Sequence, residues 1–271
     1  MKVSVIIPAF NAECTIADAI NSVFLQEMNE NIEIIVINDG STDNTAQVVS
    51  SITLQNPQCK IVLLNQINQG VATARNNGVN IATGSYIAFL DADDIWKKNK
   101  LKRQIDFLDE HLDFSLVGGN FNGLGADFFR LKKINNTDSY YEVTFDNLLL
   151  KHYFQPSTVL LRKDIFLNVG GFKSGMTHAE EGLLFFKFAY SYRCSLDKDI
   201  YINYGNNKHA FADSGLASNL KKMQAGEIYN LFYIYRAGMI GIIQFTSLVL
   251  YSCAKFTRRI FIKKVVFPLT R

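Results

Sequence analysis

The stretch Tyr86-Ile87-Ala88-Phe89-Leu90-Asp91-Ala92-Asp93-Asp94 decides how this chain folds. Five apolar residues without alternation indicate a strand that is covered on both faces, and the strand stops at a cluster of carboxylates. Carboxylates repel one another and resist leaving water, so such a cluster needs a cation or a polar ligand as its partner. Carboxylate oxygens suit Mg²⁺ or Mn²⁺ better than zinc or copper, and these cations usually also hold phosphates. The stretch therefore predicts a metal–phosphate site at the mouth of a sheet.

Three similar apolar runs precede this strand, and helical patterns lie between the runs. The candidate strands are Val3–Ile7, Ile32–Ile37, Lys60–Leu64 and Tyr86–Leu90. The candidate helices, with apolar residues or capping residues at suitable positions, are 16–24, 43–52 and 71–81. This alternation predicts an α/β fold, built as an open, mainly parallel, doubly wound sheet.

Polar turns follow three of the predicted strands. They are Pro8-Ala9-Phe10-Asn11, Asn38-Asp39-Gly40-Ser41 and Asp91-Ala92-Asp93-Asp94. Ligands of open α/β sheets bind beyond the carboxyl ends of the strands. We therefore expect the three turns to converge on one crevice, although they are far apart in the sequence.

Beyond Leu101 the pattern weakens. We expect helices over 102–111, 180–190 and 219–235, strands over 115–118, 157–161 and 196–204, and a helix that breaks at Gly170-Gly171. Residues 120–147 have little period and are predicted to be irregular. The 271 residues, nearly half of them apolar, allow a sizeable core. Four scattered cysteines without metal-ligand or disulfide spacing fit reduced thiols in a cytosolic protein, and the N-terminal apolar run is too short for a signal peptide.

Asp39 and Arg75 each have a structural and a functional interpretation. Asp39 is either part of an Asp-Gly turn with a helix cap, or an acceptor for the imide of a base such as uracil. Arg75 lies one turn into a predicted helix, where it is either an exposed side chain or a partner for a diphosphate at the helix N-terminus.

The acidic groups also have two interpretations. Asp91–Asp94 is either an acidic cap on the following helix or a metal site, and capping explains one carboxylate rather than three. Glu180-Glu181 opens an apolar helix, where the two acids either favour the helix N-terminus or supply a general base. A buried, apolar setting would raise the pKa of a glutamate towards neutrality and suit that second role. A Gly-x-Gly-x-x-Gly turn, a phosphate-binding Gly-Lys-Ser/Thr loop and a Gly-x-Ser-x-Gly elbow are all absent, which argues against dehydrogenases and α/β-hydrolases.

Four segments, in this order and spacing, resemble an inverting family 2 glycosyltransferase with the GT-A fold, of the bacterial surface-polysaccharide type. They are Val5–Asn11, Ile35–Asp43, Asn68–Gly78 and Tyr86–Trp96. The resemblance is specific over residues 1 to about 105, moderate from Ser157 to Ser218, and absent from the tail. It implies a nucleotide-sugar half at 1–105, an acceptor-binding and base-carrying half of the same domain at 106–226, and a C-terminal helical tail at 227–271.

The resemblance also implies roles for individual residues. The nucleotide would contact Pro8, Ala9, Phe10, Asn11, Asp39, Arg75 and Asp91. Asp93 would hold Mn²⁺ or Mg²⁺, and Asp91 would lie on the ribose side. The family's Glu-Asp pair corresponds to Glu180-Glu181, so Glu181 would be the base despite its extra methylene, with Glu180 as the alternative. His209 is either an added metal or diphosphate contact or a structural histidine.

The implied reaction moves one sugar from a nucleoside-diphosphate sugar, with UDP favoured because Asp39 suits an imide, to a saccharide or lipid-linked acceptor. The Gln-x-x-Arg-Trp motif of processive members is absent, so we expect a single transfer. A sugar-nucleotidyltransferase is an alternative, but Pro8-Ala9-Phe10-Asn11 is not the Gly-rich basic loop that it would need. A non-catalytic nucleotide-sugar-binding module is the other alternative, against which the set of acids argues. Nucleic acid is not an expected partner.

The C-terminal tail has a different character from the body. Residues 228–271 contain seven basic residues and no acidic one, which leaves about −4 on the rest of the chain. The uncharged stretch Ala237–Ala254 would span ~27 Å as a helix, just short of the ~30 Å core of a bilayer. We therefore expect a helix that lies on the anionic inner leaflet and makes the protein cytoplasmic and peripheral to the membrane, rather than a membrane span. The alternative is a tail that packs on the body or on a second subunit.

Overall fold

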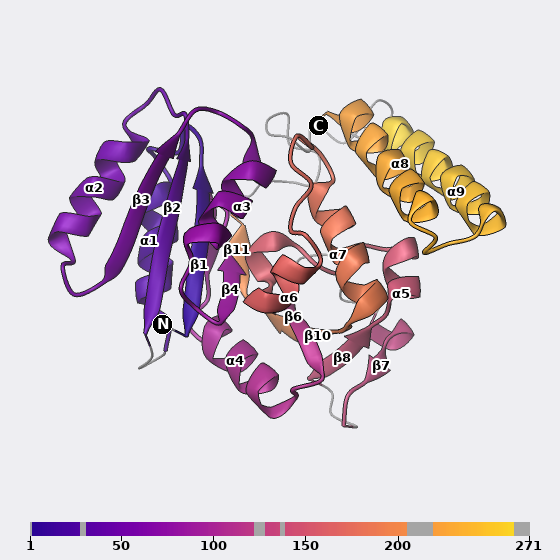
Figure 1. Cartoon of the computed structure of the whole chain (residues 1–271), viewed down its shortest axis with the longest axis horizontal. Coiled ribbons are helices and arrows are strands. Elements are labelled where there is room, and N and C mark those ends of the chain that lie inside the picture. The colour runs from indigo at the N-terminus through magenta and orange to yellow at the C-terminus, as the bar shows by residue number, and fades with distance from the viewer. Residues whose placement is uncertain (1, 28–30, 122–127, 136–138, 205–218, 263–271) are drawn as a thin grey trace.

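A single mixed sheet organises the chain (Figure 1). The computed structural model describes residues 2–27, 31–121, 128–135, 139–204 and 219–262. In spatial order the nine strands are β3 (Lys60–Gln66), β2 (Ile32–Asp39), β1 (Val3–Ala9), β4 (Tyr86–Phe89), β9 (Leu160–Arg162), β6 (Phe114–Asn120), β10 (Arg193–Ile200), β8 (Tyr140–Val143) and β7 (Lys132–Lys133). The first four are parallel to one another, as expected from their unbroken apolar runs. The α/β prediction is confirmed.

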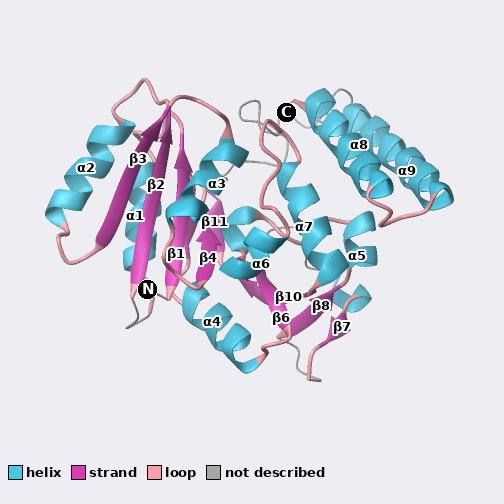
Figure 2. Ribbon diagram, in the orientation of Figure 1, coloured by secondary structure: helices cyan, strands magenta, loops and turns pink. Residues whose placement is uncertain are grey.

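Helices cover both faces of this sheet (Figure 2). One core contains side chains of α1 (Ile16–Phe24), α2 (Thr45–Gln55) and α4 (Lys100–Glu110). The other contains side chains of α3 (Val71–Ile81), α5 (Phe145–Leu150), α6 (Lys163–Asn168), α7 (Glu180–Ser191), α8 (Leu220–Arg236) and α9 (Ile242–Phe261). Successive residues of β1 alternate between the two cores, with Val5 and Ile7 on one side and Ile6 on the other.

A close contact between α3 and the sheet fixes the position of that helix. A Cβ on Gly78 would lie 2.4 Å from Cγ2 of Ile6, so only glycine fits at this point of the helix. The approach brings α3 down onto β1 and β2, with its N-terminus at the carboxyl end of the parallel strands. The helix is therefore positioned at the edge of the sheet where the three polar turns lie.

The structure differs from the sequence prediction in three segments. Residues 140–147 are not irregular, because β8 pairs with β10 and α5 begins at Phe145 behind a Thr144 cap. The strand predicted over 157–161 starts later, after a 3-10 turn at Pro156–Thr158. The strand predicted over 196–204 is two strands, of which β11 (Ile202–Tyr204) pairs with β5 (Asp94–Trp96) in a separate two-stranded sheet. The pairings of β8 with β10 and of β11 with β5 are long-range, and local periodicity does not record them.

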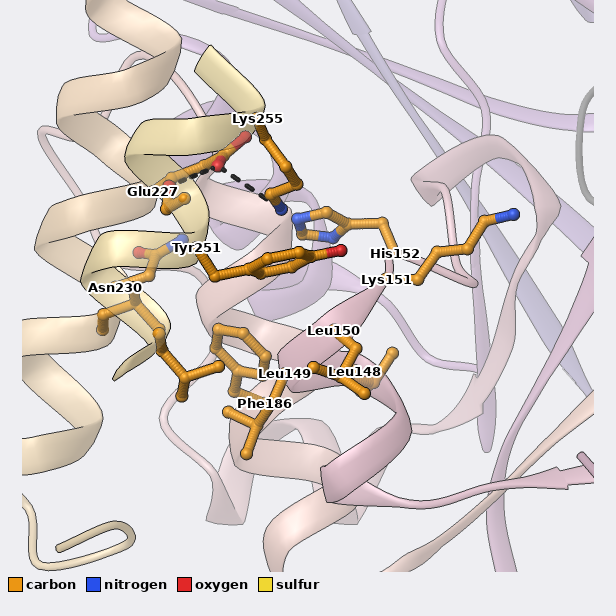
Figure 3. A pocket seen from close by; sticks show the side chains of 13 residues that line it. Leu148, Leu149, Leu150, Lys151, His152, Phe186, Glu227, Asn230, Tyr251 and Lys255 are labelled. Carbon is orange, nitrogen blue, oxygen red and sulfur yellow. Dashed lines mark hydrogen bonds and ion pairs between the residues drawn. The ribbon is translucent and has the colours of Figure 1, made fainter. Parts of the chain in front are cut away.

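The C-terminal segment forms a hairpin of α8 and α9 (Figure 1), and the boundary predicted at residues 226–227 falls inside α8. Glu227 of α8 accepts hydrogen bonds from Arg259 at 2.8 Å and from the Ser252 hydroxyl at 3.0 Å, and Lys255 lies 3.8 Å from it. Figure 3 shows Glu227, Lys255 and His152 together around a cavity of about 30 Å³. Within the described residues, no helix combines the length and the apolar character of a membrane span.

Glu227→Gln should loosen α9 from α8. The Glu227 side chain is only 10% exposed, and its loss leaves two cations without their charge partner. We expect a loss of about 1.5–3 kcal/mol, the range for hydrogen bonds to charged groups, measured as faster amide hydrogen exchange along α9.

Asp106→Asn is the matched control. It removes the exposed Lys102–Asp106 pair, which has the same 2.8 Å separation but lies on the surface of α4, where solvent screening leaves it little effect on stability. Equal effects of the two substitutions on their own helices would contradict a role for Glu227 in fastening the hairpin.

Candidate active site

A buried arginine joins three parts of the chain that the sequence separates. Arg75 of α3 is 3% exposed. One terminal nitrogen donates to Oδ1 of Asp91 at 2.7 Å, and the other donates to Oε1 of Glu180 at 3.0 Å. Asp91 directly follows Leu90 at the end of β4, and Glu180 is the first residue of α7. The interpretation of Arg75 as an exposed side chain is therefore wrong. Arg75, the predicted diphosphate contact, lies directly beside Glu180, one of the two glutamates predicted to supply the general base.

The surroundings of Arg75 hold its charge in place. The guanidinium lies over the ring of Phe172, 5.1 Å from the centroid, which is a favourable cation–π geometry. Burial alone would lower the pKa of Arg75, but Asp91 and Glu180 more than offset this and raise it. Among the described residues, nothing accepts a hydrogen bond from its Nε. That atom is a buried donor available to a ligand or a water.

The three aspartates behind β4 have different environments. Asp91 is half-buried and its backbone N–H donates to the Ser157 hydroxyl at 3.0 Å, while Asp93 is also half-buried. Asp94 is 8% exposed, and burial, followed by repulsion from Asp91, raises its pKa to about 7. Asp94 begins β5, and α4 is instead preceded by Asn99. The acidic-cap interpretation of this cluster is therefore wrong.

Glu180 and Glu181 form a second acidic pair with raised pKa values. Burial, followed by repulsion from Glu181, raises the pKa of Glu180 to about 7, although Arg75 opposes the shift. Burial also raises the pKa of Glu181, against hydrogen bonds at the helix N-terminus and the charge of Arg75. Glu180 is 6% exposed and held by Arg75, whereas Glu181 is half-buried. Of the two glutamates, Glu180 is therefore the one that Arg75 fixes in place.

Helix α8 supports the residues that lead into this pair. Ala179 has a left-handed backbone, with φ of 58°, which a residue other than glycine adopts only when its surroundings hold it there. Its carbonyl accepts a hydrogen bond from Nδ2 of Asn230 at 2.7 Å. A Cβ on Gly226 would lie 2.4 Å from the carbonyl oxygen of His178. Asn230 and Gly226 of α8 thus hold the start of α7 in one conformation.

Asp39 lies at the end of β2 and fastens the loop before α3. It is 4% exposed, and its two oxygens accept from Gln66 Nε2 at 2.7 Å and from the backbone N–H groups of Gln69 and Gly70 at 2.8 and 2.9 Å. The helix-cap interpretation of Asp39 is correct only in part, because the N–H groups that Asp39 binds lie just before α3 rather than before α2. Asp39 and Arg75 are therefore linked through α3.

The predicted nucleotide segment at the end of β1 changes from buried to exposed along its length. Pro8 and Ala9 are buried in β1, and Phe10 is 53% exposed. Asn11 has φ of 50°, and its side-chain oxygen accepts from the backbone N–H of Thr42 at 2.8 Å. The turns after β1 and β2 are thus joined to each other, next to an exposed aromatic ring.

Carboxylates suited to a hard cation are present, but they do not form a closed metal cage. Among the described residues, no three His, Cys, Asp or Glu side chains come together as a metal site. Mg²⁺ and Mn²⁺ favour oxygen ligands, and Mg²⁺ is usually held by one or two carboxylates together with substrate phosphates, so Asp91 and Asp93 fit such an ion. His209 lies outside the described residues.

Several side chains of this site were not predicted from the sequence. Phe172 under Arg75, Ser157 beside Asp91 and Asn230 behind α7 all come from segments without a recognisable motif. The one signal in the sequence was the Gly170-Gly171 pair, which marks the loop that carries Phe172. In the structure both glycines have positive φ. Trp96 is buried and donates from Nε1 to the carbonyl of Ser157, as expected of a packing residue.

Solved structures with the same fold include two proteins in complex with nucleotide sugars. The chain is similar to TarS residues 1–349 of S. aureus in complex with UDP-GlcNAc, with a TM-score of 0.70, 24% identity, and coverage of 96% of this chain and 73% of that chain. It is also similar to the mannosyltransferase PcManGT of Pyrobaculum calidifontis in complex with GDP-Man and Mn²⁺, with a TM-score of 0.70, 19% identity, and coverage of 94% and 69%. These likenesses support the GT-A fold.

Curated relatives match part of the chain. The putative teichuronic acid biosynthesis glycosyltransferase TuaG of Bacillus subtilis is 34% identical over 60% of this chain and 62% of its own length. The glucosyltransferase WfgD of Escherichia coli, named for transfer from UDP-Glc to α-D-GlcNAc-diphosphoundecaprenol, is 42% identical over 44% of this chain and 45% of its own length. The chain thus spans less than two thirds of these relatives. The model of the family described as glycosyl transferase family 2 matches residues 4–170, which is more than half of the chain, and the chain therefore belongs to that family.

Proposed function

We propose that this protein is a metal-dependent inverting glycosyltransferase that adds one sugar, from a UDP-sugar, to a saccharide or lipid-linked saccharide of bacterial surface-polysaccharide synthesis. The observation that carries the proposal is the double ion pair of Arg75 with Asp91 and Glu180. It joins the carboxyl end of the parallel strands to an acidic pair with raised pKa values. The names of TuaG and WfgD support an acceptor of this class, and the UDP-GlcNAc bound to TarS supports the donor.

The donor would lie across the turns at the carboxyl ends of β1 and β2. Phe10, Asn11 and Asp39 line these turns, and the exposed ring of Phe10 offers a stacking face for a base. Asp39 already accepts three hydrogen bonds, and a carboxylate has about four lone-pair sites, so one remains for the imide of uracil. Asp91 would face the ribose, and the unpartnered Nε of Arg75 would face the diphosphate.

The sugar would transfer in one displacement. The acceptor oxygen forms a bond to the anomeric carbon as the bond to the diphosphate oxygen breaks, and the configuration inverts. Glu181 accepts the proton of the acceptor hydroxyl. Glu180, which is bound to Arg75, fixes the position of α7 relative to Asp91. Asp93 would hold Mn²⁺ or Mg²⁺, which when bound neutralises charge on the departing diphosphate.

Glu181→Gln should lower kcat by about 10²–10⁴-fold, the usual contribution of a general base, while UDP binding by calorimetry stays unchanged. In the wild type, kcat/KM should rise with pH as the acidic pair ionises, with an apparent pKa near 7 that belongs to the pair rather than to one residue.

Two further variants distinguish the glutamates. Glu181→Asp carries the family's usual residue and should retain more activity than Glu181→Gln. Glu180→Gln should keep more activity than Glu181→Gln and shift the pH profile, because it removes the negative charge nearest to Glu181. A larger loss for Glu180→Gln, with UDP binding intact, would reassign the base to Glu180.

Asp93→Asn should abolish the increase in UDP affinity that Mn²⁺ gives the wild type, and transfer should stop with it. Asp106→Asn, which removes an exposed acid of α4, is the control and should behave as the wild type. Transfer that persists in excess chelator would rule out the metal dependence.

We further infer that the α8–α9 hairpin lies on the anionic inner face of the cytoplasmic membrane. Ile243, Leu250 and Phe261 recur along one side of α9 and are 80%, 72% and 59% exposed. Exposed basic residues accompany them, namely Lys221, Lys222, Arg236 and Arg258. An exposed apolar stripe on a hairpin that also carries exposed basic residues suits an interfacial helix on anionic lipid.

Ile243→Glu with Leu250→Glu should weaken sedimentation with phosphatidylglycerol vesicles and leave UDP binding intact. Leu54→Glu is the control, because Leu54 of α2 is 82% exposed but distant from the hairpin. Equal sedimentation of all variants, or equal binding to neutral vesicles, would contradict a membrane-facing hairpin.

A further inference from the structure

A second hollow lies behind the Arg75 cluster and has no part in the reaction described above. It measures about 400 Å³ and opens between α3, α7, α8 and the loop after α6. Phe172, whose ring lies under the Arg75 guanidinium, lines this hollow. The polar side chains that line it include Lys173, Ser174, Lys187 and Tyr233.

The wall of this hollow is held rigidly. Asn76 of α3 clamps the backbone of Phe172, donating to its carbonyl at 2.9 Å and accepting from its N–H at 3.0 Å. Gly171, with φ of 58°, leaves no room for a side chain, because a Cβ there would lie 2.7 Å from Oδ1 of Asn76. The loop that carries Lys173 therefore starts from a fixed point.

The hollow is positively charged. Nζ of Lys187 donates to the carbonyl of Gly171 at 2.6 Å, which holds the ammonium at the wall, and Lys173 is exposed on the facing loop. Burial, and then repulsion from Lys173, lowers the pKa of Lys187 to about 8. Within the part of the chain that the structure describes, no carboxylate is among the groups that shift this pKa. Two like charges therefore share this polar hollow, and none of the described residues that line it is acidic.

The hollow lies along the same side of α7 as the acidic pair. Glu180, Leu183 and Lys187 are spaced by three and four residues, so they share one face of the helix. Seven residues separate Glu180 from Lys187, which corresponds to ~10 Å along the helix axis. An extended saccharide acceptor whose reactive hydroxyl lies near Glu181 would therefore reach the two lysines with a group that is one or two sugar units away from that hydroxyl.

We propose that the hollow of Lys173 and Lys187 is an anion subsite for a phosphate group of the acceptor. Two ammonium groups match the nearly two negative charges of a phosphate monoester, and the hydroxyls of Ser174 and Tyr233 are donors for its oxygens. The assignment to the acceptor rests on the proposed function, since the donor diphosphate belongs on the Asp91 side of Phe172. The phosphate itself could belong to a soluble acceptor or to a lipid headgroup.

Competitive acylation of lysines tests the subsite without requiring transfer activity. The full-length protein is treated with acetic anhydride at about pH 7.5, with chelator present, and the acylation of each lysine is read by peptide mass spectrometry. Inorganic phosphate should slow the acylation of Lys187, roughly tenfold if binding raises its pKa by one unit. Lys98, an exposed lysine between β5 and α4, is the internal reference and should not respond.

Two variants and two other probes complete the experiment. Lys173→Gln should abolish the protection of Lys187 by phosphate, while Lys98→Gln should leave it unchanged. Protection by phosphatidylglycerol vesicles but not by inorganic phosphate would assign the anion to a lipid headgroup. Protection by glucuronate but not by phosphate, or no protection by any probe, would overturn the proposal. Because none of these readouts uses a sugar donor, a failed subsite and a failed transferase assignment are distinguishable.

Discussion

Burial of one guanidinium is the constraint on which this structure depends. Arg75 is enclosed by the fold, and a charge in that position is tolerated only with opposite charges in direct contact. Asp91 and Glu180 provide them, from the end of β4 and the start of α7. Removing one partner of such a buried pair typically costs about 3–5 kcal/mol. The same contact therefore stabilises the sheet against its covering helices and brings the two acidic clusters together.

The electrostatics of the cluster suit an anionic ligand despite its many acids. Burial raises the pKa values of Asp94 and Glu180 to about 7, and that of Glu181 is raised as well. At neutral pH these carboxyls do not all carry a full charge, so a diphosphate meets less repulsion than a count of acids suggests. Arg75 keeps its charge throughout this range. The site can therefore accept a nucleoside diphosphate and still hold carboxylates that accept protons.

The sequence predicted the parallel part of the fold because each of its strands is an unbroken apolar run that ends at a polar turn. It also marked Arg75, Asp91 and the glutamate pair as candidates, since each lies at a strand end or a helix start, and the structure brings Arg75 into contact with Asp91 and Glu180. It did not predict how Asp94 is buried, because β5 pairs with β11 more than a hundred residues away. Asn230 was missed for the same reason, since a side chain that holds another helix leaves no local pattern.

The central claim is that Arg75 and the two acidic groups form one electrostatic unit, and the pKa of Glu180 tests it most directly. Carbon-13 NMR of protein labelled at the glutamate carboxyls, assigned with Glu180→Gln, would follow the titration. The account predicts a midpoint of about 7 in the wild type and a higher one in Arg75→Gln, because Arg75 favours the ionised carboxylate. A midpoint near the ordinary value of 4.5, unchanged by Arg75→Gln, would contradict it.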